Sequence, residues 1–232
     1  PLILVTNDDG ITAPGLRTLI GLMKSIGDVV VVAPDSPQSG MGHAITIDNT
    51  LYSKKVVIDH KNGAPTEYSC SGTPADCVKL GIREILDRRP DLVVSGINHG
   101  SNSSINVIYS ANFEGAAEAI KTITTEALKH GIPFGTVLNV NIPKTDGKPP
   151  KGIKVCRQAK ANWREKFDKR LSPTGKEYYW LTGEFELLDE GEDTDIHALE
   201  NGFTSVVPTQ FDLTAHKTIS HLNTWNFNGN QN

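Results

Sequence analysis

Two adjacent aspartates near the start of the chain, Asp8 and Asp9, are the residues best suited to chemistry. They follow the apolar run of residues 2–5 and precede Gly10. The run lacks polar alternation, which indicates a strand covered on both faces of a parallel sheet. Ligands bind beyond the carboxyl ends of such strands, where a turn lets both carboxylates converge. Adjacent carboxylates repel one another unless a cation lies between them. Aspartate is also common in turns and helix caps, but this pair after a buried strand favours a divalent-metal site.

Two further polar loops are expected at the same edge of the sheet. Residues 35–42 follow the apolar run 29–33 and contain Ser39, and residues 96–100 follow the run 92–95 and contain Asn98. Together with the two aspartates, these loops offer only oxygen ligands. Such a set suits a hard cation, Mg²⁺ or Mn²⁺, and does not suit zinc or copper. The sequence therefore predicts one composite metal site on the rim of the sheet, with open positions for water and phosphate.

The remaining polar residues of the rim loops allow several interpretations. Ser39, Gly40 and the following Met-Gly could present backbone N–H groups to a phosphate, although a plain turn is an equally good explanation. His99, beside Asn98, could protonate a leaving alkoxide. A lone histidine near a site more often packs or hydrogen-bonds, so no role is assigned to His43, His99 or His197. The chain has neither a P-loop motif nor a Gly-x-Gly-x-x-Gly motif after its first strand.

The first 143 residues alternate between expected strands and helices, which predicts an α/β fold. Strands are expected at residues 2–5, 29–33, 92–95 and 136–142, with extended segments or a hairpin between 44 and 59. Helices are expected from Pro14 to Gly27, from Thr73-Pro74 to Leu86, and over residues 113–130. This order is typical of a Rossmann-like, doubly wound, mainly parallel sheet. The core is predicted to occupy residues 1–143.

The second half of the chain is less regular. A Pro/Gly/Lys linker at 144–152 precedes expected strands at 153–158 and 178–186, which flank a charged stretch, 160–176. Residues 144–192 are too few for a core of their own, so we expect an extended β arm that serves assembly. A helix over 194–201 and a strand over 203–207 lead residues 193–232 back to the core.

Composition restricts the function classes. The chain has 232 residues, of which 38% are hydrophobic and 22% are charged, and a formal net charge of −4. This charge argues against a surface for nucleic-acid polymers. The three cysteines are too few and too scattered for a disulfide framework or a zinc site. No signal peptide or membrane-length apolar stretch is visible, so a cytoplasmic protein without membrane contact is expected.

The segment from Val5 to Ile11, with Ala13-Pro14-Gly15 after it, resembles the opening of the SurE family of stationary-phase survival proteins, a 5′/3′-nucleotidase family. Further segments agree in the same order: Ala33-Pro34 with Gln38-Ser39-Gly40, Ser71-Gly72-Thr73-Pro74-Ala75-Asp76-Cys77-Val78, Ser95-Gly96-Ile97-Asn98 with Gly100 and Asn102, Tyr109-Ser110, Leu138-Asn139-Val140-Asn141-Ile142-Pro143, and Thr194-Asp195 with Ala198. The resemblance covers nearly the whole chain. It implies a metal-dependent phosphomonoesterase that acts on nucleoside monophosphates.

The resemblance also implies which residues form the site. Metal ligation and catalysis fall on Asp8, Asp9, Ser39 and Asn98, with one Mg²⁺ or Mn²⁺ ion per subunit. The residues expected to bind phosphate are Asn7, Ser39, Gly40, Asn98, Asn102 and Ser110. Either a water molecule or an aspartate could be the nucleophile. Activity on 3′-monophosphates and polyphosphate stays open, and a homodimer or homotetramer is expected.

Two other function classes compete with the nucleotidase. A receiver-like signalling module also places an acidic pair after its first strand and binds Mg²⁺. It needs a later acceptor aspartate, whereas the strand 92–95 is followed by Gly96 and then by Asn98. A non-catalytic nucleotide-binding protein is the third interpretation, which metal-dependent turnover would exclude.

The sequence departs from the family pattern at two places. Ser110 runs directly into Ala111, where the family continues with a glycine-threonine turn, a helix and another strand. Either the chain lacks a strand of the sheet, or a stretch is missing between these residues; we favour the second, because deleting an internal helix and strand would expose core. The other departure is Asn106, which stands where many members carry an acid.

Overall fold

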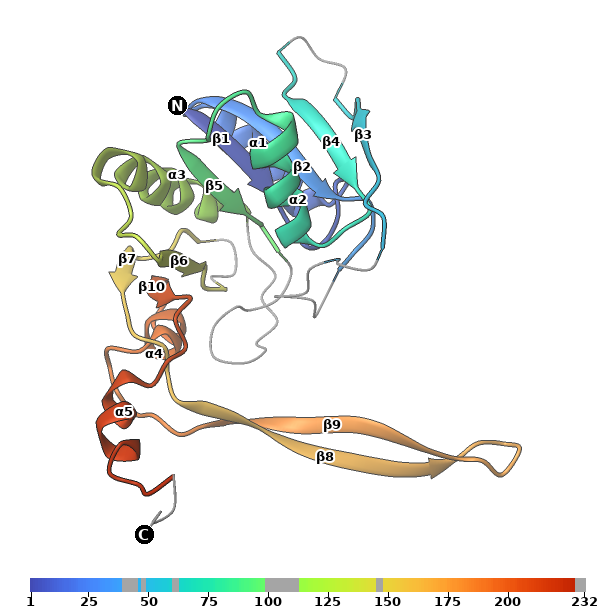
Figure 1. Cartoon of the computed structure of the whole chain (residues 1–232), viewed down its shortest axis with the longest axis vertical. Helices are drawn as coiled ribbons and strands as arrows, with labels where there is room; N and C mark the ends of the chain where they lie inside the picture. The colour runs from blue at the N-terminus through green and yellow to red at the C-terminus, as the bar shows by residue number, and fades with distance from the viewer. Residues whose placement is uncertain (39–45, 47–48, 60–62, 99–112, 145–147, 228–232) are drawn as a thin grey trace.

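The computed structural model describes residues 1–38, 46, 49–59, 63–98, 113–144 and 148–227. Its main sheet has five strands in the order β3-β4-β2-β1-β5 (Figure 1). The strands are β1 (Leu2–Thr6), β2 (Asp28–Pro34), β3 (Ser53–Val56), β4 (Thr66–Cys70) and β5 (Leu92–Ser95). All neighbouring pairs are parallel except β3 with β4. The predicted parallel strands β2, β1 and β5 are therefore direct neighbours, with β1 in the centre.

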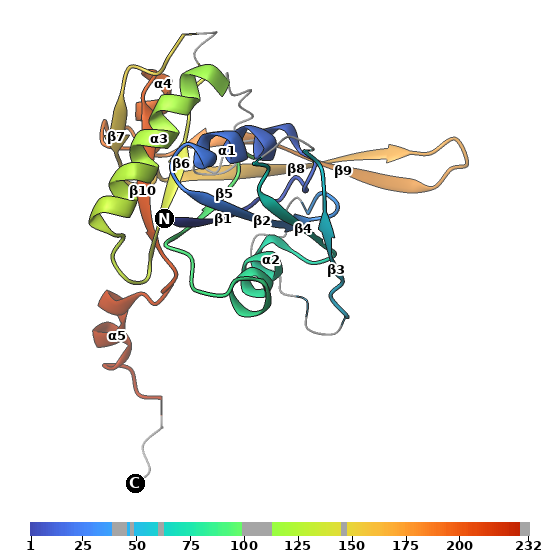
Figure 2. The same ribbon diagram turned by 90° about the horizontal axis from the view of Figure 1, so that it is seen from above.

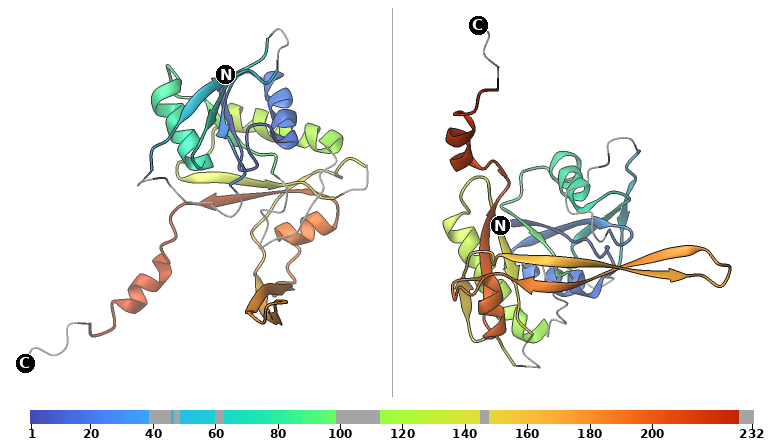
Figure 3. Two further views of the ribbon diagram at one scale, coloured as in Figure 1. Left: turned by 90° about the vertical axis from the view of Figure 1, so that its right-hand side faces the viewer. Right: turned by 90° about the horizontal axis from the view of Figure 1, so that it is seen from below.

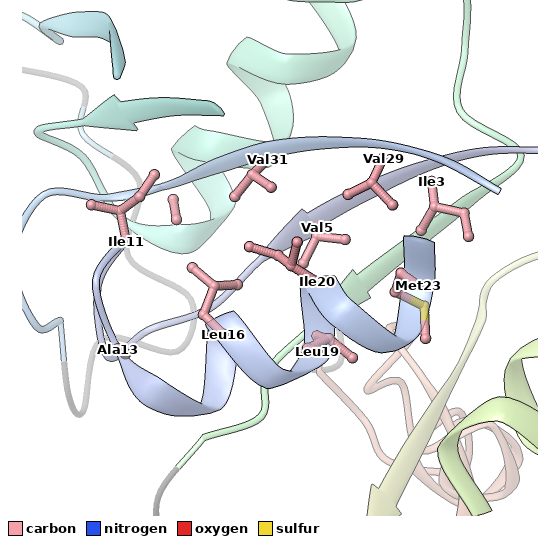
Figure 4. Packing of buried hydrophobic residues seen from close by; sticks show 11 residues of the cluster. Ile3, Val5, Ile11, Ala13, Leu16, Leu19, Ile20, Met23, Val29 and Val31 are labelled. Carbon is pink, nitrogen blue, oxygen red and sulfur yellow. The ribbon is translucent and has the colours of Figure 1, made fainter. Parts of the chain in front are cut away.

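Helices cover both faces of this sheet (Figure 2). Helix α1 (Pro14–Lys24) lies on one face, where Leu16, Leu19 and Met23 pack against Ile3 and Val31 (Figure 4). Helix α2 (Pro74–Leu80) lies on the other face and continues into a π-helical turn, η1 (Gly81–Ile85). Alternate residues of each strand face opposite sides of the sheet, so a run of consecutive apolar residues can fill both cores. The doubly wound fold is as predicted.

A second, three-stranded sheet has the order β6-β10-β7. Its strands are β6 (Thr136–Asn141), β7 (Ile153–Val155) and β10 (Thr204–Gln210), and helix α4 (Asp195–Glu200) packs on it through Ala198. Helix α3 (Phe113–His130) lies against α1, where the Thr124 hydroxyl is 4.0 Å from the sulfur of Met23. A short helix that the sequence did not predict, α5 (His216–Leu222), lies on a C-terminal segment that extends away from the body (Figure 3).

A long antiparallel hairpin, β8 (Ala161–Leu171) and β9 (Glu177–Leu187), projects from the body (Figure 1). The sequence predicts the first strand of this arm at residues 153–158, and that position is wrong. Strand β8 lies instead within the charged stretch 160–176. Only Ile153–Val155 of the expected strand 153–158 is extended, and it pairs with β10 instead. The many charged residues of β8 obscure the alternation of its side chains between two faces. Trp163, Phe167 and Leu171 lie on the same face of the strand.

Strands β5 and β6 each lie at the edge of a sheet and carry exposed apolar side chains. In the described part of the chain, β5 pairs only with β1 and β6 pairs only with β10. Val93 on β5 is 39% exposed and Val137 on β6 is 63% exposed. No helix among the described residues is long and apolar enough to cross a bilayer.

Candidate active site

The end of β1 is held in a tight turn that carries both aspartates. Asn7 is fully buried, and its side-chain amide donates a hydrogen bond to the carbonyl oxygen of Gly10 at 3.0 Å. Gly10 has a φ of 98°, a conformation that strains any residue with a Cβ. The amide of Ile11 then donates to the carbonyl of Pro34 at 2.8 Å, which ties the turn to the end of β2. The turn therefore fixes Asp8 and Asp9 just beyond the carboxyl end of the central strand.

The loops after β2 and β5 are tied to the same strand end. The amide of Gln38 donates to the carbonyl of Asp8 at 2.7 Å, and the amide of Gly96 donates to the carbonyl of Thr6 at 3.0 Å. Thr6 pairs in register with Ser95, so Asn98 follows β5 at the edge of the sheet where Asp8 follows β1. The three strand ends therefore form one rim.

This rim brings together four of the predicted site residues: Asn7, Asp8, Asp9 and Asn98. The other predicted residues, Ser39, Gly40, Asn102 and Ser110, lie outside the described residues, as do His43 and His99. His197 lies in helix α4 on the second sheet, and its amide donates to the Thr194 hydroxyl at 3.3 Å.

The electrostatics of the turn disfavour two free negative charges. Burial raises the pKa of Asp8, and the neighbouring charge of Asp9 raises it further, against a smaller lowering by a backbone hydrogen bond. Both carboxylates are half-buried. A cation beside them would offset the cost of burial and the repulsion together.

Several buried oxygen atoms at the rim have no hydrogen-bond partner in the described structure. They include Oδ1 of Asp8, Oδ1 of Asn98 and Oδ1 of Asn7. A buried acceptor without a donor costs about 1–3 kcal/mol, so such atoms are retained where a ligand satisfies them. Within the described ranges, no three His, Cys, Asp or Glu side chains come together as a metal site. Carboxylate and amide oxygens fit a hard divalent cation, and the available donors are therefore of the right kind.

One buried carboxylate near the rim, Asp76, is not among the predicted site residues. Asp76 accepts hydrogen bonds from Thr73 and from Thr46, which is 30 positions away in the chain. The Thr-x-x-Asp spacing of residues 73 and 76 is a capping-box pattern and could have been noticed. No local sequence pattern predicts the hydrogen bond from Thr46 to Asp76.

The sequence matches the family model described as "Survival protein SurE" over residues 3–122 and 111–165. The chain belongs to the SurE family. It is 60% identical over 255 residues to the "5'-nucleotidase SurE" of Christiangramia forsetii, covering 98% of each chain. It is 61% identical over 256 residues to the protein of the same name from Flavobacterium johnsoniae, covering 99% of this chain and 98% of the relative.

A solved structure of a SurE family member agrees with the fold. The SurE protein from Aquifex aeolicus superposes with a TM-score of 0.81 at 37% identity, covering 97% of this chain and 99% of that chain. The family resemblance and the α/β fold predicted from the sequence are thereby confirmed. The alignments to the two named SurE relatives span more positions than the 232 residues of this chain, so those relatives contain residues without a counterpart here.

Proposed function

We propose that this chain is a metal-dependent phosphomonoesterase that hydrolyses nucleoside 5′-monophosphates to nucleoside and phosphate. The observation that carries the proposal is the pair of half-buried aspartates at the same end of the sheet as Asn98, with buried oxygen atoms on Asp8 and Asn98 that lack partners in the described structure. Membership of the SurE family supports the substrate class, since the curated relatives are named 5′-nucleotidases.

The metal site would consist of Asp8, Asp9, Ser39 and Asn98. A divalent cation, Mg²⁺ or Mn²⁺, supplies Lewis-acid charge for the phosphate oxygens when it is bound. Asp8 would act in one of two ways: it would orient and deprotonate a water that displaces the nucleoside from phosphorus, or it would itself displace the nucleoside, and water would then hydrolyse the aspartyl-phosphate. Phosphoryl transfer depends mainly on such positioning and on charge stabilisation, which suits a site with few reactive side chains.

Neutral donors around the rim would bind the phosphate. The amide nitrogen of Asn98 and the backbone N–H of Gly40 would donate to its equatorial oxygens, with Asn102 and Ser110 as further donors. Asn7 is buried and bonded to Gly10, so its contribution would come through the shape of the turn. Such oriented donors typically contribute about a hundred- to a thousandfold to turnover each. Hydrolysis of 3′-monophosphates and of polyphosphate belongs to the same proposal.

The β8–β9 arm would serve assembly into a homodimer or homotetramer. The register places Trp163 opposite Phe185 and Phe167 opposite Leu181 on one face of the hairpin. Phe167 and Leu181 are 64% and 57% exposed. A two-stranded hairpin is marginally stable alone in water, and burying each such side chain is worth about 1.5–3 kcal/mol. A second copy of the chain that covers this apolar face would supply that stabilisation.

The base of the arm is held by charged hydrogen bonds. Arg157 donates from Nη2 to Asp189 and from Nε to Asp193, each at 2.9 Å. Asp189 also accepts from the amide of Lys160 at 3.1 Å. The Arg157 guanidinium, together with the amides of Lys160 and Gly191, holds the pKa of Asp189 well below its usual range. These bonds connect the residues before β8 with the residues after β9 at the base of the arm.

A phosphate-release screen tests the proposed activity. The purified protein is incubated with Mg²⁺ and nucleoside 5′-monophosphates, 3′-monophosphates, polyphosphate or an aryl phosphate, in parallel with Asp8→Asn and with Asp28→Asn. Asp28 is an exposed aspartate at the opposite end of β2, so Asp28→Asn is a matched control for the charge change. The proposal requires turnover of 5′-monophosphates that Asp8→Asn loses and Asp28→Asn keeps. Retention of label from a small phosphodonor, without turnover, would indicate a receiver-like module instead.

A further inference from the structure

The first turn of helix α1 packs closely against the backbone of the loop that follows β5. Gly15 is the second residue of α1 and is buried. A Cβ added to Gly15 would collide with the carbonyl oxygen of Ile97 and would lie 3.0 Å from its carbonyl carbon. Because both of these are backbone atoms in a close-packed region, such a contact can be relieved only by movement of the chain. The absence of a side chain at position 15 therefore sets how closely the loop after β5 approaches α1.

Helix geometry does not itself require a glycine at this position. Gly15 lies within an α-helix and is not among the glycines with a positive φ. Glycine in a helix is destabilising relative to alanine, so a glycine there needs another explanation. Gly21 on the same helix offers a comparison, because no atom lies within 4 Å of the place where its Cβ would be. Alanine would thus fit at position 21 without displacing anything, whereas at position 15 it would displace the loop.

The same loop is held at two further points. The amide of Gly96 donates to the carbonyl of Thr6 at 3.0 Å, which attaches the loop to the end of β1. The half-buried side chain of Ile97 packs against the apolar cluster under α1, to which Leu16 belongs (Figure 4). The next residue is Asn98, whose Oδ1 is buried and has no hydrogen-bond partner in the described structure. The chain that leads into Asn98 is therefore held both by the strand end and by α1.

We infer that Gly15 is a positioning residue for the reaction: because it has no side chain, the loop after β5 can lie against α1 and hold Asn98 at the rim. This inference rests on the proposed function, which assigns Asn98 to the metal and phosphate site. Gly15 has no polar side chain to offer a ligand, so its effect is transmitted through Ile97. A misplacement of a catalytic group by about 1 Å can lower activity by about a hundredfold.

The test adds one methyl group at either end of the sheet. Gly15→Ala places it against the loop that carries Asn98. Gly27→Ala is the matched control, because a Cβ there would collide with the carbonyl oxygen of Pro1 and lie 2.8 Å from its Cγ. Gly27 directly precedes β2, whose first residue pairs with the start of β1, so this clash lies at the end of the sheet opposite the rim.

Both substitutions are made in the wild type and in Asn98→Ala, which gives a double-mutant cycle. For each protein the melting temperature, the Mn²⁺ dissociation constant, and kcat and KM for adenosine 5′-monophosphate are measured. Gly15→Ala is expected to lower kcat about ten- to a hundredfold in the wild type. In Asn98→Ala it should lower kcat by no more than about twofold, whereas an independent structural effect would repeat the full loss. Gly27→Ala should lower the melting temperature comparably and leave kcat near that of its parent in both backgrounds.

Three results would each overturn the inference: wild-type kcat in Gly15→Ala, an equal loss of kcat with and without the Asn98 side chain, or an equal loss in Gly27→Ala. Should Gly15→Ala not fold, Ile97→Ala takes its place, because it removes the side chain that packs under α1 and adds no clash. Its control is Ile26→Ala, which shortens an isoleucine that packs on the same cluster just before Gly27. The same pattern of losses is then required. A wild-type protein inactive on every nucleotide would overturn the proposed function itself, whereas an active wild type with any of the three results overturns only this inference.

Discussion

Replacing Asp8 by asparagine should have opposite effects on stability with and without metal. In the metal-free protein, burial and the charge of Asp9 raise the pKa of Asp8 above its value of 3.8 in the unfolded chain. A carboxyl group with a raised folded pKa is harder to ionise in the folded state. Its unfavourable contribution is therefore absent below pH 3.8 and complete once the pH exceeds the folded pKa. At neutral pH, Asp8→Asn removes that contribution and should leave the metal-free protein at least as stable as the wild type.

With metal, the order should reverse. A ligand that binds only the folded state at a hundred times its dissociation constant adds about 2.7 kcal/mol. For a chain of this size each kcal/mol corresponds to about 2–4 °C, so Mg²⁺ should raise the melting temperature of the wild type by about 5–11 °C. Asp8→Asn removes one of the two anionic ligands and should show little of this increase.

The assay is thermal denaturation near neutral pH in EDTA and in excess Mg²⁺, with Asp28→Asn as the control that keeps both aspartates of the turn. The melting curves of the wild type and Asp8→Asn should change their order between the two conditions, and the control should follow the wild type. A variant that melts well below the wild type in EDTA would refute the repulsion argument. A variant with the full Mg²⁺ increase would refute the ligand assignment.

Three further predictions concern other parts of the molecule. Ser39→Ala and Asn98→Ala should each lower kcat about a hundred- to a thousandfold and change metal affinity less, as titration with Mn²⁺ would show. Their neutral oxygens bind metal more weakly than carboxylates do, whereas the Ser39 hydroxyl and the Asn98 side-chain N–H group would donate to phosphate. Replacing residues 165–183 by a two-residue Asn-Gly turn should shift sedimentation towards the monomer and leave part of the aryl phosphatase activity. A variant that stays fully oligomeric would contradict the role of the arm in assembly. Hydrogen bonds from Arg88 and from the Leu2 amide lower the pKa of Asp91 to about 2. Asp91→Asn should therefore be less stable than the wild type above pH 3.8, and equal denaturation midpoints should be found only as the pH falls to about 2.

The sequence predicts the strand ends of the rim because local patterns determine them. Residues 2–5, 29–33 and 92–94 are uninterrupted apolar runs, and such runs are typical of strands buried on both faces. The aspartate pair could be placed at the rim from the same reasoning, since only Thr6 and Asn7 separate it from the end of the first run.

The missed elements depend on contacts that are distant in sequence. Strand β4 contains Glu67, which is only 2% exposed. Because a glutamate is expected at the surface, a hydrophobicity pattern does not reveal this buried strand. Its charge is accommodated by Arg17 on α1, whose Nη1 lies 2.7 Å from Glu67 Oε2. The bond between Thr46 and Asp76 escaped for the same reason. A buried polar group is predicted only when its partner is known, and here each partner is at least 30 residues away.

The most direct test of the proposed activity is a metal titration of phosphate release. The wild-type protein is freed of metal with EDTA and incubated with adenosine 5′-monophosphate while Mg²⁺ or Mn²⁺ is added stepwise. We expect no release in EDTA, saturable release with added metal, and loss of that release in Asp8→Asn but not in Asp28→Asn. Equal release with and without metal, or equal release by the wild type and Asp8→Asn, would contradict it.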